Sequence, residues 1–358
     1  MADQVQIPAN IVTLTVDGRA HRGWTGVRIR RSLDALTGSF ELKLTSREVT
    51  QGEVRKIRAL APCTISIDGE QLITGTIDSL SISLSSTAHE IAVVGRDKAA
   101  DLVDCSAIVS PGSWRKAKLE TIVADLVKPF GIKVKFTADT GMPVRRFAIQ
   151  QGETVHAAIE RLCRFRALTA WSEPDGAIVI GNPASGANVG KIVEGESLIE
   201  MAISHDVADR YSDYIFKGQA SGDDEANGKA VTQLKASAKD PAIGRYRPLL
   251  IVAEEQADST SLKKRADWEA NVRAARGQTM TATVPGWRDP SGAIWKPGVK
   301  VQAVAPSLDV DLPMLVISAE LSRDEGGTVT RLELQRPEAW QQLAVPESAD
   351  ASTLKRAA

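Results

Sequence analysis

The sequence predicts an α+β protein that is mostly β, with two related small β-barrels, an α+β middle domain and a helical insertion. Three observations lead to this prediction. Short runs of alternating apolar and polar residues with Asp-Gly turns occur early in the chain, and strand-like runs return near its C-terminus. Two stretches with helical periodicity lie between them. The length of 358 residues is sufficient for two or three domains.

The first barrel is expected at residues 1–98. "NIVTLTVDGR" and "PCTISIDGEQLITGTIDSLSISL" each contain an alternating run followed by Asp-Gly, the pair typical of a tight hairpin turn. "SFELKLTS" and "HEIAVVGRD" continue the alternation. Several short strands at this spacing indicate a small barrel or sandwich.

The middle domain is expected at residues 99–182, because the hydrophobic period changes there. "KAKLETIVADLVKPFG" places a row of apolar residues on one helical face and ends at Pro129 and Gly131. "GETVHAAIERLCRFRA" predicts a second helix. "LTAWSEPDGAIVIG" then predicts a hairpin, which completes an α+β unit.

Strands return in the last part of the chain, and we expect the second barrel at residues 183–219 and 279–340. Residues 220–278 contain a polar loop and one predicted helix, which predicts an insertion in this barrel. Residues 341–358 are polar and rich in Ala and Ser, which predicts a flexible tail.

An internal repeat connects the two predicted barrels. The run at Phe40 resembles the run at Tyr214, and the strand-like segments of 61–97 resemble those of 296–337 in the same order. The spacing between matched segments increases along the chain, and the increase falls in 220–278. The repeat therefore predicts two related barrels, the second with an insertion.

Composition limits the function classes. Lys+Arg (44) and Asp+Glu (45) nearly cancel, which argues against a protein whose main task is to grip nucleic acid. Cys63, Cys105 and Cys163 have neither a disulfide framework nor zinc spacing, so we expect reduced thiols. "MADQVQIPAN" lacks the pattern of a signal peptide, and no apolar run reaches the length of a membrane span, so no membrane insertion is expected.

Three segments carry a resemblance to a known family: "ADRYSDYIFKGQ", "TVPGWRDPSGAIWKPGVKVQAVAP" and "LVISAELSRDEGGTVTRLELQRPEAW". They resemble the baseplate hub proteins of contractile-tailed phages, above all the tail hub of Mu-like phages. The middle segment "FAIQQGETVHAAIERLCRFRALTAWSEPDGAIVIG" is similar to phage late-control tail proteins and to the hub part of type VI secretion spikes.

The resemblance implies a structural function. A hub of this family is a homotrimeric ring that joins the six-fold tail tube to the three-fold spike and surrounds an axial DNA channel. The implied partners are further copies of the chain, the tail tube protein, the central spike protein and other baseplate proteins, with DNA only as passing cargo. The implied location is the virion tail baseplate, after assembly in the host cytoplasm.

Two groups of residues are candidates for this function. Aromatic side chains are favoured at protein interfaces, and the aromatic residues expected at a subunit interface are Trp287, Trp295, Tyr211 and Tyr214. Ordinary packing in the core is the alternative for the two tryptophans. A small basic cluster lies in "VRIRRS", and the residues expected to face the channel are Arg28, Arg30 and Arg31. The alternative for this cluster is an ordinary solvated strand edge.

The sequence nominates no catalytic residue, metal ligand or cofactor site, so no enzymatic activity is expected. "SHD" at 204–206 places neighbours on opposite faces of a strand, which rules out a converging triad. His156 and Glu160 are one helical turn apart but lack further ligands for a metal. An alternative function is a peptidoglycan-binding, LysM-like module at 150–182, and a tail-associated hydrolase is a second.

Overall fold

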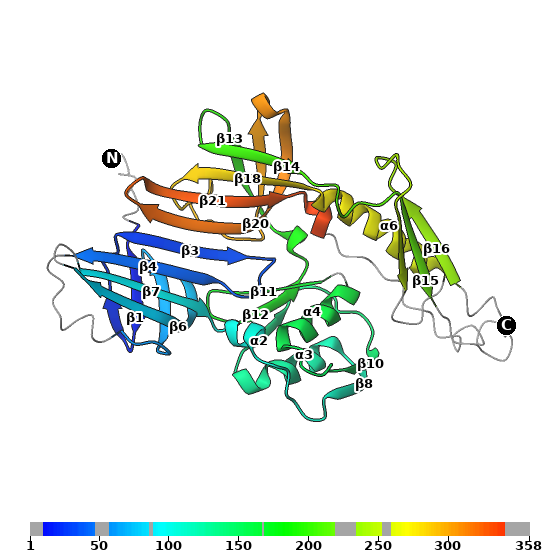
Figure 1. Ribbon diagram of the computed structural model, residues 1–358, viewed down its shortest axis with the longest axis horizontal. Coiled ribbons are helices and arrows are strands. Elements are labelled where there is room, and N and C mark those ends of the chain that lie inside the picture. Colours follow the sequence, from blue (N-terminus) through cyan, green and yellow to red (C-terminus); the bar gives the residue numbers. More distant parts are fainter. Residues whose placement is uncertain are drawn as a thin grey trace, which may run out of the picture. The chain divides into compact units, whose positions relative to one another are not determined.

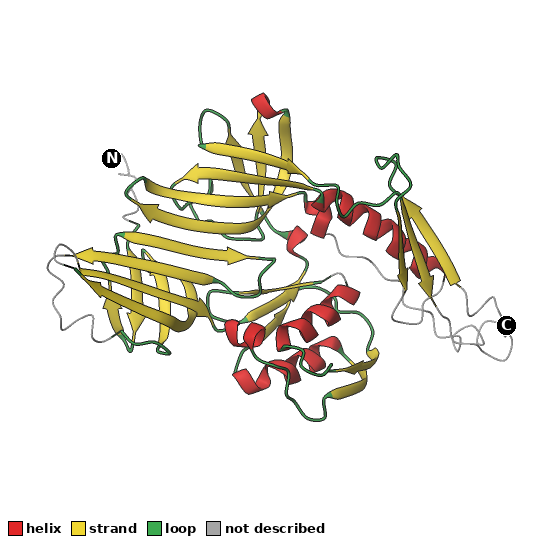
Figure 2. Ribbon diagram, in the orientation of Figure 1, coloured by secondary structure: helices red, strands yellow, loops and turns green. Residues whose placement is uncertain are grey.

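The computed structural model describes residues 10–46, 57–85, 89–166, 168–218, 234–252 and 259–340. Strands dominate, and helices gather in the middle part of the chain and after residue 259 (Figures 1 and 2). The predicted mostly β, α+β class is therefore confirmed. The chain divides into two compact units, residues 1–202 with 281–334 and residues 203–280 with 335–358. The predicted tail at 341–358 lies outside the described residues.

The N-terminal part forms a set of antiparallel strands. Its strands are β1 (Val12–Val16), β2 (Arg19–His21), β3 (Gly26–Ser32), β4 (Ser39–Ser46), β5 (Pro62–Ile67), β6 (Glu70–Leu84) and β7 (His89–Asp97). The Asp17-Gly18 pair connects β1 to β2, and Asp68-Gly69 connects β5 to β6. All four residues have positive φ, as the predicted tight turns require.

The middle part packs two amphipathic helices against short strands. Its elements are α2 (Ala100–Asp104), β8 (Ser113–Ala117), α3 (Leu119–Val127), η1 (Lys128–Phe130), β9 (Val134–Phe136), β10 (Val144–Ala148), α4 (Val155–Phe165), β11 (Thr169–Ser172), β12 (Ile178–Gly181) and η2 (Pro183–Ser185). The apolar faces predicted for α3 and α4 are buried in one core. Thr154 caps α4, because its side chain accepts a hydrogen bond from the Ala157 N–H.

The C-terminal part adds a second set of strands to the same large sheet. Its elements are β13 (Asn188–Val193), β14 (Glu200–His205), β18 (Gln278–Pro285), β19 (Lys300–Ala305), η3 (Pro306–Leu308), β20 (Val310–Asp324), β21 (Gly327–Gln335) and η4 (Pro337–Trp340). These strands form a sheet of 13 strands together with the N-terminal set.

The two sets of strands repeat one another in order and in length. The pairing order β3-β4-β7-β6-β5-β1 matches β14-β18-β21-β20-β19-β13. β4, β5, β6 and β7 contain 8, 6, 15 and 9 residues, and β18, β19, β20 and β21 contain the same numbers. We call these the N-terminal and C-terminal strand sets. The closure of each set into a barrel stays a prediction.

The inserted segment has a sheet and a core of its own. β15 (Asp213–Gly218) pairs with β16 (Leu234–Lys239) and β17 (Pro248–Val252), and α6 (Ser259–Arg276) packs on them. Tyr214, Phe216 and Leu262 lie in this core.

The structure differs here from the alignment of Tyr214 with Phe40. The strand that takes the place of β4 in the C-terminal set is β18, and Tyr214 belongs to the separate sheet. Alternation alone cannot say which sheet a strand joins, because every half-buried strand has the same period. The insertion therefore begins just after β14 instead of at residue 220.

Candidate functional site

The joint between the two strand sets is an ordinary antiparallel pair of strands inside one chain. The second half of β20 pairs with β3, with Leu321 opposite Ile29 and Arg323 opposite Val27. Val27, Ile29 and Leu321 are buried. Figure 1 shows the two strands side by side. One continuous sheet therefore connects two similar halves of the chain.

Arg323 fastens this joint to the N-terminal set. Its guanidinium donates to the Asn10 carbonyl (3.0 Å) and to the Trp24 carbonyl (3.0 Å), and it lies over the Trp287 ring. Arg288 adds an ion pair with Asp68 at 3.2 Å. The joint therefore combines strand pairing with two arginine contacts.

One face of the joined sheet is polar and carries charges of both signs. Arg28 and Arg30 alternate along β3 with the buried Val27 and Ile29, so both arginines lie on the same face. Arg28 pairs with Glu41 (3.5 Å) and Glu320 (3.6 Å). Arg30 pairs with Glu333 (3.4 Å), and Lys43 pairs with Glu41 (2.9 Å). We call this surface of β4, β3, β20 and β21 the polar face.

The polar face includes a shallow hollow of about 190 Å³. The residues that line it are Arg30, Ser318, Glu320, Arg331 and Glu333. Because carboxylates lie beside the arginines, the surface offers little net positive charge for binding phosphate. Exposed pairs of this kind contribute little to stability, so their effect is on the charge of the surface.

The third arginine of the cluster, Arg31, points elsewhere. It lies opposite the buried Ala319 in the register of β3 and β20. Its guanidinium donates to the Ser172 carbonyl at 3.1 Å. Burial lowers the pKa of Arg31, although Glu173 and Asp97 act in the opposite direction. The structure therefore brings Arg28 and Arg30 together and places Arg31 on the other side of the strand.

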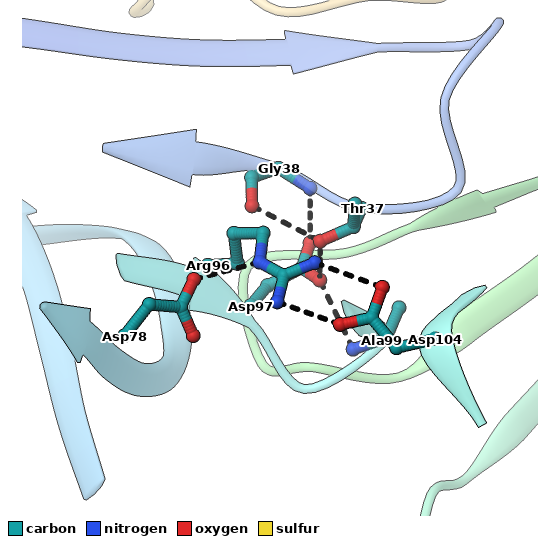
Figure 3. A network of polar contacts seen from close by, with 7 residues as sticks. All are labelled: Thr37, Gly38, Asp78, Arg96, Asp97, Ala99 and Asp104. Atoms are coloured by element: carbon teal, nitrogen blue, oxygen red, sulfur yellow. Dashed lines mark hydrogen bonds and ion pairs between the residues drawn. The ribbon is translucent and has the colours of Figure 1, made fainter. Parts of the chain in front are cut away.

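The buried carboxylate of Asp97, which no sequence motif predicted, shares the partner residue Ser172 with Arg31. Figure 3 shows Asp97 and its contacts with Thr37, Gly38 and Ala99. Asp97 ends β7 and is 4% exposed. It accepts hydrogen bonds from Thr37 Oγ1 (2.8 Å) and Ser172 Oγ (2.5 Å), and from two backbone N–H groups, those of Gly38 (2.6 Å) and Ala99 (3.0 Å). Burial raises the pKa of Asp97, and these hydrogen bonds offset part of that effect. In the sequence, the one indication of a role for Asp97 is its position at the end of "GRD", directly before the segment that forms α2.

Arg96 precedes Asp97 and faces the opposite side of β7. It pairs with Asp78 on β6 and with Asp104 on α2, both at 2.7 Å (Figure 3). The hydrogen bond from Arg96 lowers the pKa of Asp104. The end of β7 therefore joins the N-terminal strand set to the middle domain through two adjacent charged side chains.

The aromatic interface candidates lie mostly inside the chain. Trp287 and Trp295 are 1% and 3% exposed, and the Trp287 Nε1–H donates to the Ser322 carbonyl at 3.0 Å. Tyr214 is buried, and its hydroxyl accepts from the Tyr211 N–H. Tyr211 is partly exposed and lies under Arg247. Packing within one subunit accounts for the three buried rings, and a contact with a neighbouring subunit stays a prediction.

The described residues contain no group of three or more His, Cys, Asp and Glu side chains that could hold a metal ion. Glu160 forms its ion pair with Arg164 (2.9 Å).

Cys63 and Cys163 are buried, and burial raises the pKa of each thiol to about 12. In the described part of the chain, no helix has the length and apolar character of a membrane span.

Comparison with protein families assigns the class of protein. The matches are to the Mu phage baseplate assembly protein GpP-like N-terminal domain (11–97), the second domain of baseplate hub protein gp44-like proteins (99–182), the third domain of tail protein NMB1110-like proteins (210–268) and the fourth domain of Mu phage baseplate assembly protein GpP (258–342). The class is therefore a baseplate protein of a phage tail.

Individual relatives make the assignment specific. The chain is 32% identical to the baseplate hub protein gp44 of Escherichia phage Mu, over 97% of this chain and 92% of that protein. It is similar to the 43 kDa tail protein of prophage MuSo2 from Shewanella oneidensis (33% identity, 93% and 99% coverage, TM-score 0.81). It is also similar to a tail protein from Neisseria meningitidis MC58 (25% identity, 92% and 97% coverage, TM-score 0.77).

The chain belongs to the family of Mu-like phage baseplate hub proteins. This confirms the resemblance found in the sequence, and it makes the chain a structural component of the virion tail.

Proposed function

We propose that three copies of this hub form a ring that adapts the six-fold tail tube to a three-fold spike. The observation that carries the proposal is the pair of matching strand sets joined edge to edge in one chain. Three such chains present six similar positions on a closed ring. A ring of this kind can meet a six-fold partner on one side and a three-fold partner on the other.

The proposed ring surrounds an axial path for DNA, with Arg28 and Arg30 of the polar face toward it. The mixture of arginines with Glu41, Glu320 and Glu333 supports this role. A strongly basic surface would hold DNA through many phosphate contacts and oppose its passage. A surface of balanced charge suits a conduit.

The proposed partners are the tail tube protein, the central spike protein and other baseplate proteins. Assembly takes place in the host cytoplasm, and the hub has no catalytic activity of its own. No described feature favours the peptidoglycan-binding alternative at 150–182 or the hydrolase alternative, and both stay predictions.

The molar mass of the purified chain tests the ring. Three chains of 38.4 kDa give about 115 kDa for a closed cyclic trimer in sedimentation or light scattering. Electron microscopy of that species should show a ring with an open centre. A monomer, or a dimer with two-fold symmetry, would contradict the proposal.

A further inference from the structure

Because the two strand sets match, the pairing partners of a strand in one set can be compared with those of the matching strand in the other set. β20 has 15 residues and its neighbour β19 has 6, so the edge of β20 that pairs with β19 extends beyond it. Its first half, from Val310 to Leu315, pairs with β19. Its second half, from Ser318 to Arg323, pairs with β3 of the N-terminal strand set. The second half of β20 is therefore the edge that joins one strand set to the next.

β6 takes the place of β20 in the N-terminal set and has the same 15-residue length. Its first half pairs with β5 as far as Thr76. Its second half pairs with β7 on one edge, and among the described residues no strand pairs with its other edge. Ile82 and Leu84 in this half are 50% and 81% exposed. Among the described strands, the edge that is covered in β20 is therefore open in β6.

A register shift decides which side chains this open edge presents. The pairing of β6 with β7 is irregular between Ile77 and Ser79. Beyond the shift, Leu80 lies opposite the buried Val93, and Ile82 lies opposite the buried Ile91. Leu80, Ile82 and Leu84 therefore share the face of the sheet that is buried elsewhere, and the intervening serines share the polar face.

β14 lies at one end of the strand order of the 13-stranded sheet and takes the place of β3 in the C-terminal strand set. Thr25 N–H donates to the Lys43 carbonyl at the start of β3 (2.9 Å), and Ile199 N–H donates to the Thr283 carbonyl at the start of β14 (2.8 Å). β3 has partners on both edges, whereas the described part of the chain gives β14 one strand partner, β18. Its apolar residues Met201 and Ile203 are partly exposed.

We propose that the open edge of β6, from Ser79 to Leu84, pairs antiparallel with β14 of a second copy of this chain. The register follows from the pair of β20 with β3. It places Ile82 opposite Ile203 of the partner subunit, and Leu84 opposite Met201 of the partner subunit. This pairing buries the exposed apolar side chains on one face and continues the small polar residues of the other face from copy to copy.

The contact is head-to-tail, because each copy offers β6 at one place and β14 at another. Such an interface closes into a ring when the rotation per copy allows it, and it removes the two open edges that would otherwise recruit strands nonspecifically. Only the number of copies rests on the proposed function. The pairing itself rests on the repeat.

Cysteine cross-linking tests the register. In a Cys105→Ser background, Ser83→Cys and Ala202→Cys would lie directly opposite each other, where Cα atoms of antiparallel strands are about 4.5–5.5 Å apart and within disulfide reach. The matched control combines Ser79→Cys with Ala202→Cys, displaced by about 13 Å along the strand. We expect covalent trimers from the first pair on a non-reducing gel, and little product from the control or from either single variant.

The outcomes separate this inference from the ring proposal. Cross-links from the first pair in a species other than a trimer would support the edge pairing and contradict the trimer. A trimer in which the first pair does not cross-link would overturn the edge pairing and leave the ring intact. If the wild-type chain stays monomeric at tens of micromolar and the first cysteine pair gives no cross-link, both the edge pairing and the ring proposal are overturned.

A second measurement uses the two faces of β6. Ile82→Lys places a charge in the proposed apolar contact, and Ser81→Lys places the same charge on the polar face. We expect Ile82→Lys to lower the assembled fraction at least tenfold at a fixed concentration, with Ser81→Lys close to wild type. Equal effects of the two substitutions would overturn the assignment of the faces.

Discussion

At the scale of single residues, Asp97 connects segments that are far apart in the sequence. Its carboxylate takes donors from the loop before β4, from the start of α2 and from β11. Bonds between an ionised acceptor and backbone N–H groups are stronger than neutral ones. Asp97 therefore holds the N-terminal strand set and the middle domain in register.

The substitution Asp97→Asn tests this connection. One carboxylate oxygen becomes an NH2 group that must face a donor, so at least one backbone N–H or hydroxyl loses its acceptor. We expect the free energy of unfolding to fall by about 1–3 kcal/mol, the usual cost of an unsatisfied buried group. Urea denaturation of the purified variant gives this value.

Asp104→Asn is the matched control, because Asp104 is an exposed partner of Arg96. Its loss should have a clearly smaller effect than the loss of Asp97. Similar effects of the two variants would show that Asp97 does not act as a buried connector.

His156 on α4 makes stability depend on pH. Burial lowers the pKa of His156 below its ordinary value, and the nearby Glu160 opposes this only in part. The folded state therefore binds this proton less readily than the unfolded state. The contribution of the neutral side chain is complete above pH ~6.5 and is lost as the pH falls through the lower folded pKa.

We expect the wild-type chain to lose stability relative to His156→Gln between pH 7.5 and pH 5. Denaturation curves of both proteins at the two pH values measure the difference. Curves that move in parallel would contradict the prediction.

At the scale of elements, β7 requires glycine at position 95, where it pairs with Phe40 of β4 on one side and with Ile77 of β6 on the other. A Cβ on Gly95 would lie 2.5 Å from the Phe40 Cζ atom and would also collide with the Thr76 carbonyl. Real Cβ atoms do not approach backbone this closely. The strand can therefore pass over the buried ring of Phe40 only without a side chain at this position.

Gly95→Ala should lower the free energy of unfolding by about 1–3 kcal/mol, the range for overpacked cores. The matched control is Gly244→Ala, because a Cβ at Gly244 meets nothing within 4 Å and its φ is not positive. That variant should stay within about 0.5 kcal/mol of wild type. Thermal or urea unfolding of both decides the prediction, and a stable Gly95→Ala protein would contradict it.

Local patterns predicted the individual elements well, and long-range pairing was harder to predict. The buried face of α3 and the turns at Asp17-Gly18 and Asp68-Gly69 follow from spacing and turn chemistry within a few residues. The sheet that contains Tyr214 depends on partners that adjacent residues do not encode. The same holds for Arg31, whose neighbours in "VRIRRS" suggested one basic patch although its guanidinium points to Ser172.

At the scale of the whole molecule, the insertion is a separable addition to the repeat. In the N-terminal set, residues 33–38 connect β3 to β4. In the C-terminal set, the matching strands β14 and β18 are connected through the unit that contains α6. The two ends of this connection already meet, since Asp206 N–H donates to the Gly277 carbonyl at 2.8 Å. A tight turn could therefore take its place.

A chain in which Asn-Gly replaces residues 207–276, and which ends at Arg336, should fold and assemble as the full chain does. The C-terminal truncation is needed because Trp340 packs near α6, with Arg276 over its ring. The same replacement with residues 337–340 retained is the control, and it should be less soluble because the buried Trp340 becomes exposed. Circular dichroism and molar mass measure both properties. Loss of cooperative unfolding in the first variant would show that the repeat needs the insertion to fold.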